Sequence, residues 1–421
     1  MKVRAIKYDL PKKYEQGKKS FTYDIKEKLK ETFITMYEKF PFYQEVCKNE
    51  NITKKDLEKI IDNEEFYKLP GVWAESFKRG KGLIEEINDK TAISQYKKGD
   101  VLYFQMSSST SGDPSYVLTN EEELRRTIDN FSKIFKKEGV SVVYVFMPSK
   151  KLLDLEGKLG AYKGIPTTLR VGLSLHGLEE LYNDVRYYVN LDFKKVLLRL
   201  INKKVKPIRK DNIQKVKNII EEWKNRGKGI GLGGFSLLLD PTLDEWIKEG
   251  VRFDIGDRVY IILGGGGYSG RKGKVEGKAI IKKNLVEKAC EVFGINKEEC
   301  ADRIIDTYAF TEQQGAHEGR WNWDLEDFLF TVGDDTIMYI IDPETGKPIT
   351  EPGKKGLIKV ITYYLKPENI LSCNASVIQR DLAMPIEVGE RKEVIKFTGI
   401  ERQKGASIEG CAFKGEEILG E

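Results

Sequence analysis

Residues 103–116 read YFQMSSSTSGDPSY and concentrate phosphate-compatible groups more densely than any other stretch of the chain. Five consecutive hydroxyl side chains precede Gly112, and Asp113-Pro114 then ends the turn; they are Ser107, Ser108, Ser109, Thr110 and Ser111. Backbone N–H groups and hydroxyl donors with little side-chain bulk suit a loop that wraps a polyphosphate. A solvated Ser/Gly connector is the alternative, and composition alone favours it.

The sequence on either side of this loop favours the phosphate site. Residues 101–105 predict a short strand before the loop, and Asn120 followed by Glu123 predicts the N-cap of a helix that ends at Gly139. Residues 142–147 predict the next strand. This order is typical of an α/β protein with a largely parallel sheet and covering helices. The loop would then lie outside the strand ends, where ligands bind in such sheets.

Composition bounds the remaining possibilities. The 421 residues are 40% hydrophobic and 33% charged, which predicts a large core in one big domain or two. Lys and Arg exceed Asp and Glu by 71 to 66, and a net charge of +5 is too small to indicate a nucleic-acid or polybasic membrane partner. The charged N-terminus and the lack of a long apolar run predict a soluble, cytoplasmic protein.

The cysteines indicate neither a disulfide framework nor a structural zinc site. They are odd in number, widely scattered and without CxxC spacing: Cys47, Cys290, Cys300, Cys373 and Cys411.

Further elements follow from local patterns. Apolar residues at helical spacing predict an N-terminal helical lobe over residues 20–63. A strand over 259–263 runs directly into four glycines and Tyr268, which requires a sharp turn or the close approach of a flat group. The remaining predicted elements are a helix over 278–293 that ends at Gly294, a strand over 303–308, and a turn over 342–348 between strands 337–341 and 356–362.

The loop resembles the phosphate loop of adenylate-forming enzymes, Ser-Gly-Thr-Thr-Gly-x-Pro-Lys, with Ser109 in place of glycine and Ser115 in place of lysine. Later motifs occur in the order of that family: the Gly-rich turn, Tyr308-Ala309-Phe310-Thr311-Glu312, the hairpin and Arg380-Asp381. The resemblance covers roughly residues 70–415. It implies the large α/β domain of such an enzyme, with mixed sheets and covering helices.

The resemblance also implies roles for individual residues. Thr311 would help to hold the α-phosphate of ATP, Glu312 would bind Mg²⁺, and Tyr308 would lie beside the adenine. Asp381 would hold both ribose hydroxyls, because a carboxylate accepts two hydrogen bonds at once. The other nucleotide-binding residues would be Ser107, Ser108, Ser109, Thr110, Ser111, Gly112, Gly265, Gly266 and Gly267. On the residues alone, Thr-Glu also suits an exposed helix start, Arg-Asp a surface ion pair, and His317 the scaffold.

The end of the chain resembles the acyl-protein synthetases of bacterial luciferase systems, the LuxE family. These also stop near the hinge at which other adenylate-forming enzymes continue into a lobe of about 100 residues, and they carry Gly-Cys near the terminus. Residues 1–385 are therefore expected to form the large domain, and 386–421 a short segment with Cys411 as acyl acceptor. Packing in a terminal hairpin is the alternative for Cys411. Arg402 would lower the thiol pKa or contact the adenylate.

The chemistry implied is a ligase reaction in two steps. A carboxylic acid, expected to be a fatty acid, attacks the α-phosphate of ATP, and the acyl-AMP then acylates Cys411 as a thioester. An acyl reductase is the partner implied by analogy. The alternatives are a CoA ligase related to phenylacetate-CoA ligases, and a nucleotide-binding homologue without catalysis.

Overall fold

The computed structural model describes a mixed α/β fold, as predicted. The described residues are 23–77, 102–106, 115–120, 122–123, 126, 142–148, 164–166, 185–189, 217–218, 220–221, 224, 229–264, 266, 268, 271–272, 275–276, 279–313 and 315–403.

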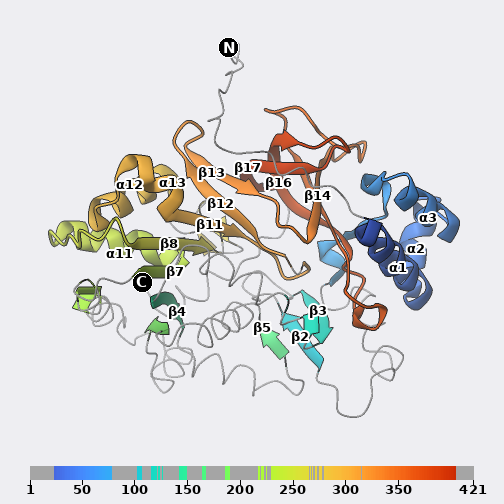
Figure 1. Cartoon of the computed structure of the whole chain (residues 1–421), viewed down its shortest axis with the longest axis horizontal. Helices are drawn as coiled ribbons and strands as arrows, with labels where there is room; N and C mark the ends of the chain where they lie inside the picture. Colours follow the sequence, from blue (N-terminus) through green and yellow to red (C-terminus); the bar gives the residue numbers. More distant parts are fainter. Residues whose placement is uncertain are drawn as a thin grey trace.

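Among these residues, a sheet of twelve strands forms the centre of the molecule (Figure 1). Its order is β14-β15-β16-β17-β13-β12-β11-β8-β7-β4-β6, and β1 pairs with β16 outside this path. The strands are β1 (Val72–Trp73), β4 (Val142–Pro148), β6 (Val185–Val189), β7 (Ile230–Phe235), β8 (Val259–Gly264), β11 (Ile304–Tyr308), β12 (His317–Asn322), β13 (Asp327–Thr331), β14 (Thr336–Ile341), β15 (Gly356–Thr362), β16 (Ser376–Val388) and β17 (Val394–Arg402).

The pairing changes character at β11. Strands β6, β4, β7, β8 and β11 are parallel, whereas β11 pairs antiparallel with β12. From β12 to β14 all neighbours along the path are antiparallel. The predicted largely parallel sheet is therefore wrong for this half, because short connections such as 389–393 join antiparallel strands whereas parallel strands need long crossovers. The expected domain boundary after residue 385 falls inside β16, so residues 386–403 continue the same sheet.

Helices lie at both ends of the sheet. At one end of Figure 1 are α1 (Tyr23–Lys39), α2 (Pro41–Asn49) and α3 (Lys54–Asp62), where the N-terminal helical lobe was predicted. At the other end are α11 (Ser236–Lys248), α12 (Lys282–Phe293) and α13 (Cys300–Arg303). Short 3₁₀ helices are η1 (Phe66–Lys68), η2 (Ala74–Phe77), η4 (Lys297–Glu299) and η5 (Pro367–Asn369).

Two hydrophobic clusters fill the core. One packs α11 and α12 against the parallel strands, around Trp246, Phe253 and Phe293. The other packs α1–α3 against β14–β16, around Phe33 and Tyr43. Phe310, which follows β11, packs against both clusters. The end of β11 therefore lies where the two halves of the core meet.

A smaller sheet is formed by one strand that precedes the Ser-rich loop in sequence and two strands that follow it. It has the order β3-β2-β5, with β2 (Leu102–Met106), β3 (Tyr116–Asn120) and β5 (Gly164–Pro166). Strand β2 corresponds to the strand predicted before the loop, but β3 was not predicted. Asn120 Oδ1 accepts a hydrogen bond from the Glu123 backbone N–H at 3.0 Å, which confirms the predicted N-cap. A two-stranded sheet pairs β9 (Arg271–Lys272) with β10 (Val275–Glu276).

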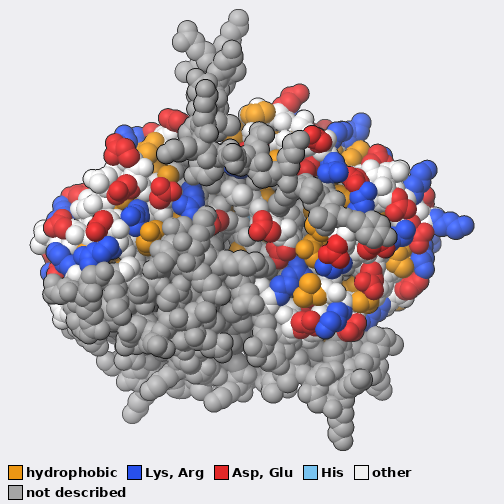
Figure 2. All heavy atoms as spheres, in the orientation of Figure 1, with side chains coloured by type: hydrophobic (Ala, Val, Ile, Leu, Met, Phe, Trp, Pro, Cys, Tyr) orange, Lys and Arg blue, Asp and Glu red, His pale blue; other side chains and the backbone are white. Residues whose placement is uncertain are grey.

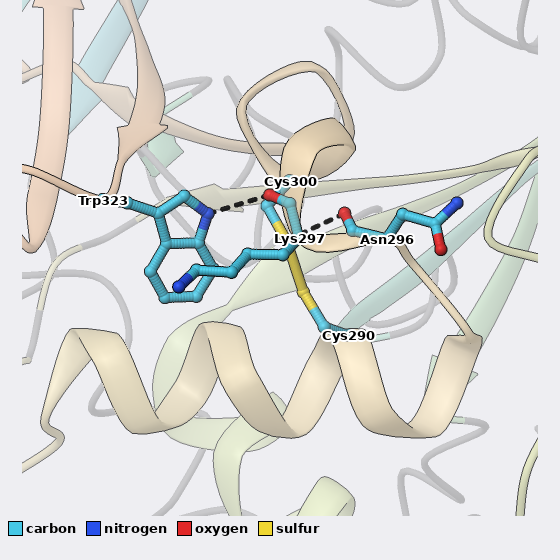
Figure 3. The surroundings of a disulfide bond; sticks show 5 residues. All are labelled: Cys290, Asn296, Lys297, Cys300 and Trp323. Carbon is cyan, nitrogen blue, oxygen red and sulfur yellow. Dashed lines mark hydrogen bonds between the residues drawn. A yellow bond between two sulfur atoms is a disulfide. The ribbon is translucent and has the colours of Figure 1, made fainter.

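A disulfide joins Cys290 of α12 to Cys300 of α13 (Figure 3). The prediction that the cysteines form no disulfide is therefore wrong for this pair. Spacing in sequence did not reveal it, because the pairing depends on a reversal of the chain at Gly294, whose φ is +72°. Beside the pair, Trp323 Nε1 donates to the Lys297 carbonyl oxygen at 2.9 Å, and Cys300 Sγ lies 3.5 Å from the Asn296 carbonyl oxygen.

Charges of both signs are interspersed over the described surface on the face that Figure 2 shows. Many pair with each other at the surface, such as Lys28 with Asp24 at 2.7 Å and Lys283 with Glu326 at 2.6 Å. No helix in the described part of the chain is long and apolar enough to cross a membrane.

Candidate nucleotide-binding site

Two side chains from two other strands converge on the carboxylate of Asp381. Asp381 of β16 and Arg402 of β17 are register partners, and Arg402 Nη1 lies 3.0 Å from Asp381 Oδ1. Tyr308, at the end of β11, donates its hydroxyl to Asp381 Oδ2 at 2.8 Å. Burial, together with the neighbouring Asp381 charge, holds the pKa of Tyr308 well above its ordinary value. The phenol therefore stays protonated at neutral pH and acts as a donor.

These contacts fix the orientation of the Asp381 carboxylate. Among the described residues each oxygen has one hydrogen-bond partner, whereas a carboxylate has about four acceptor positions. The Asp381 side chain is 18% exposed, so a ligand can reach it. A fixed, accessible carboxylate of this kind suits a diol such as ribose.

Thr311 and Glu312 follow β11 and are buried, at 4% and 3% exposure. The Glu312 backbone carbonyl oxygen accepts a hydrogen bond from Asn374 Nδ2 at 3.1 Å. In the Glu312 side chain, Oε2 lies 3.5 Å from Gln379 Nε2. No helix begins at these residues, because the chain passes from a turn into β12. The alternative of an exposed helix start therefore does not hold.

Strand β16 connects the two groups of contacts. Gln379 and Asp381 are two positions apart on this strand, in a stretch where the register with β15 shifts. Gln379 contacts Glu312, and Asp381 contacts Tyr308. One short stretch of β16 thus contacts Glu312, the predicted metal ligand, and carries Asp381, the predicted ribose ligand.

The Gly-rich turn begins at the end of β8, directly beside β11. Gly264 pairs with Thr307, whose hydroxyl donates to the Leu263 carbonyl oxygen at 2.7 Å. A Cβ at Gly264 would lie 2.9 Å from Thr307 Oγ1, so this approach requires glycine. Gly266 has a φ of +62° and its carbonyl oxygen accepts from Ser236 Oγ at 2.8 Å. The turn therefore begins next to the end of β11, which carries Tyr308.

Asp306 of β11 is a buried carboxylate beside this turn. It accepts a hydrogen bond from the Tyr268 hydroxyl at 3.0 Å and one from the Thr307 backbone N–H at 2.9 Å. Burial raises the pKa of Asp306 to about 6, against the opposing effect of the Lys282 charge. Sequence reasoning missed this residue, although a charge within a strand of apolar neighbours is itself a signal.

The segment 70–77 packs beside the strand that carries Asp381. Strand β1 pairs with β16, and the Arg380 guanidinium lies 4.2 Å from the centre of the Trp73 ring. Arg380 Nε also donates to Glu75 Oε1 at 2.7 Å. Arg380 thus contacts Trp73 and Glu75, whereas the next residue, Asp381, contacts Tyr308 and Arg402.

The structure brings Tyr308, Asp381 and Arg402 into contact through side chains that reach across the sheet from β11, β16 and β17. Thr311 and Glu312 follow β11, and Gly266 lies in the turn after the neighbouring β8. Gln379, Asn374 and Ser236 also support this region but were not predicted. The remaining predicted site residues lie outside the described part of the chain: Ser107, Ser108, Ser109, Thr110, Ser111, Gly112, Gly265, Gly267 and Cys411.

The sequence matches the profile of the family described as "Acyl-protein synthetase, LuxE" over residues 14–419. The chain belongs to this family. Its membership confirms the predicted resemblance and the prediction of an AMP-forming ligase. It also supports ATP-dependent activation of an acid as the general reaction of this LuxE-family chain.

Solved structures with the same fold are adenylate-forming ligases. A crystal structure of 2-hydroxyisobutyryl-CoA ligase in an open conformation, with 2-HIB-AMP and CoA, covers 90% of this chain and 74% of its own, with a TM-score of 0.56 and 10% identity. The same ligase in its postadenylation state, with 2-HIB-AMP, covers 90% and 67%, with a TM-score of 0.56 and 11% identity. No curated protein matches the chain in sequence. At such low identity, the structural likeness establishes the fold of the LuxE-family chain and not its substrate.

Proposed function

We propose that this chain activates a long-chain carboxylic acid with ATP and transfers the acyl group to its own Cys411. The observation that supports adenylation most directly is the hydrogen-bonded cluster of Tyr308, Asp381 and Arg402. It supplies a fixed carboxylate for a ribose beside an aromatic ring for an adenine. Membership of an acyl-protein synthetase family supports the transfer step.

In the first step, Asp381 accepts hydrogen bonds from both ribose hydroxyls, and Tyr308 lies beside the adenine. Thr311 and the hydroxyls of residues 107–111 donate to the phosphates. A carboxylate oxygen of the acid attacks the α-phosphorus, the bond to the pyrophosphate oxygen breaks, and acyl-AMP forms. Donors placed where negative charge develops lower the barrier for such a displacement.

Glu312 is the residue we propose as the metal ligand. No cluster of three or more His, Cys, Asp or Glu side chains is found among the described residues. Mg²⁺ commonly binds through one or two carboxylates together with substrate phosphates and water, so a single buried Glu312 fits this metal. Bound Mg²⁺ would offset negative charge on the phosphates. The contact with Gln379 orients the Glu312 carboxylate before ATP arrives.

In the second step, the Cys411 thiolate attacks the carbonyl carbon of acyl-AMP. The bond to the phosphate oxygen breaks, AMP leaves, and a thioester remains on the enzyme. Arg402 already contacts the Asp381 carboxylate, which supports a role for it in holding the adenylate while the acyl group transfers. The acyl group would then pass to an acyl reductase. Transfer to coenzyme A is the second candidate, because the ligase with the same fold was solved with CoA.

Intact-protein mass after incubation with Mg-ATP and a long-chain acid tests this proposal. Wild-type protein is expected to gain one acyl group that neutral hydroxylamine removes. Cys411→Ser should release pyrophosphate but carry no labile adduct. Cys47→Ala is the matched control, because Cys47 is a free, buried cysteine in α2, and this variant should be acylated like wild type.

The other outcomes identify the alternatives. If no variant is acylated but acyl-CoA forms when coenzyme A is added, the chain is a CoA ligase. If pyrophosphate release is absent with every acid in a panel while ATP still binds, the chain is a nucleotide-binding homologue without catalysis.

A further inference from the structure

Asp306 is a buried charge that the proposed reaction does not use. Its side chain lies within β11 and is only 5% exposed. An ionised carboxylate in such a position is costly unless donors and charges compensate for the lost water. The compensating groups are the Lys282 charge and two hydrogen-bond donors, the Tyr268 hydroxyl and the Thr307 backbone N–H. Of these contacts, the one with Tyr268 joins Asp306 to the Gly-rich turn.

Tyr268 is the residue that Asp306 holds, and several elements meet on it. Its backbone carbonyl oxygen accepts from the Ile280 N–H at 2.8 Å, and Lys282 Nζ lies 5.0 Å from the ring centre. Lys282 itself forms an ion pair with Asp327 of β13. The start of α12, β11 and β13 therefore all position Tyr268. The carbonyl oxygen of Gly266, two residues before Tyr268, accepts a hydrogen bond from Ser236 Oγ at the start of α11.

Strand β11 carries two tyrosine–aspartate hydrogen bonds two positions apart. Asp306 accepts from Tyr268 of the Gly-rich turn, and Tyr308 donates to Asp381. Residues at this spacing share a face of the strand. A single strand thus connects the segment after β8 to the carboxylate assigned to the ribose.

We propose that Asp306 is a positioning residue for the nucleotide site, which holds Gly266 and Tyr268 beside Tyr308 through the Tyr268 hydroxyl. The link to nucleotide binding rests on the proposed function, whereas the link between Asp306 and Tyr268 does not. Asp306 then acts on the reaction only through the turn and does not touch ATP.

Amide hydrogen exchange tests the positioning role in the ligand-free protein. Tyr268→Phe and Asp306→Leu both remove the Tyr268–Asp306 hydrogen bond, and Tyr268→Phe also removes the hydrogen bond of this hydroxyl with Ser236. Exchange in peptides covering residues 262–268 should become about tenfold faster in both. Asp306→Asn retains an acceptor oxygen and should stay near the wild-type rate. Lys283→Ala is the matched control, because Lys283 pairs at the surface with Glu326, directly beside the pair of Lys282 and Asp327. Unchanged exchange in both Tyr268→Phe and Asp306→Leu would overturn the inference.

Kinetics test the consequence for ATP. The kcat/KM for ATP in pyrophosphate release should fall about tenfold in Tyr268→Phe and in Asp306→Leu, and the double variant should be no worse than either. Asp306→Asn should retain most of the wild-type kcat/KM for ATP. If Asp306→Leu is impaired while Tyr268→Phe is not, Asp306 contacts the nucleotide directly and the positioning role is wrong. If the wild type releases no pyrophosphate with any acid, the proposed function fails, and the exchange experiment still decides the role of Asp306.

Tyr268→Phe removes a single oxygen and serves as the test if Asp306→Leu does not fold.

Discussion

Asp381 is the residue on which the nucleotide assignment depends most. Replacing it with alanine should weaken ATP binding by about 1.5–3 kcal/mol, the usual range for a hydrogen-bond partner that carries a charge. Calorimetric titration of the variant with ATP measures this directly. Asp342→Ala is the control, since Asp342 holds an exposed turn and should leave ATP binding unchanged. An unaltered dissociation constant in Asp381→Ala would remove the ribose assignment.

Glu312 is tested by a change that keeps its shape. Glu312→Gln removes the negative charge that Mg²⁺ requires, so Mg²⁺-dependent pyrophosphate release should be lost while the far-ultraviolet circular dichroism spectrum stays that of the wild type. Glu326→Gln changes an exposed glutamate of the β12–β13 turn and should have no effect. Wild-type activity in Glu312→Gln would show that the metal binds elsewhere.

Asp306 gives a prediction about pH. Burial raises its pKa from 3.8 to about 6, so the folded protein holds this proton more tightly than the unfolded chain does. Its contribution to stability is complete below pH 3.8 and is lost as the pH rises through about 6. Because Asp306→Asn is never ionised, its free energy of unfolding relative to wild type should increase with pH across this window, by on the order of 3 kcal/mol. Urea denaturation between pH 4 and pH 8 measures the difference, and a difference independent of pH would contradict the expected ionisation.

At the scale of single elements, local sequence was a good guide where the determining residues are close together. The Asn120 N-cap, the helix stop at Gly294, strands β8 and β11, and the turn at Asp342 were all predicted from neighbouring residues, and the structure contains each of them. The pairing of elements was harder. The pairing of β13 with β17 joins strands more than sixty residues apart, Phe330 with Phe397, and local patterns do not encode such a partner.

Gly294 permits a quantitative test of one such element. It ends α12 with a φ of +72°, and an added Cβ would lie 3.2 Å from Asp254 Cα. Gly294→Ala should therefore lower the free energy of unfolding by more than the roughly 1–2 kcal/mol cost of a left-handed residue. Gly346→Ala isolates that cost, because Gly346 has a φ of +66° with nothing within 4 Å of an added Cβ. Equal losses in the two variants would show that the contact with Asp254 is relieved without cost.

At the scale of the whole molecule, the order of motifs indicated which residues gather, but not how they contact one another. The resemblance assigned Tyr308 to the adenine and Asp381 to the ribose as separate roles. It did not predict that Tyr308 would hydrogen-bond Asp381, because that contact depends on how β11, β16 and β17 are arranged in the sheet. Asp306 and Gln379 were missed for the same reason, since each acts on a residue distant in sequence.

The change of pairing at β11 has a consequence for the order in which the molecule folds. The hairpins β12–β13, β14–β15 and β16–β17 join strands close in sequence, whereas β4 and β7 pair across more than eighty residues of chain, Val142 with Ile230. Contacts of short sequence separation form faster, because less chain entropy is lost in closing the loop. The hairpin half is thus expected to form early and the parallel half late. Because Tyr308 belongs to the strand between them, the proposed nucleotide site is complete only when both halves have docked.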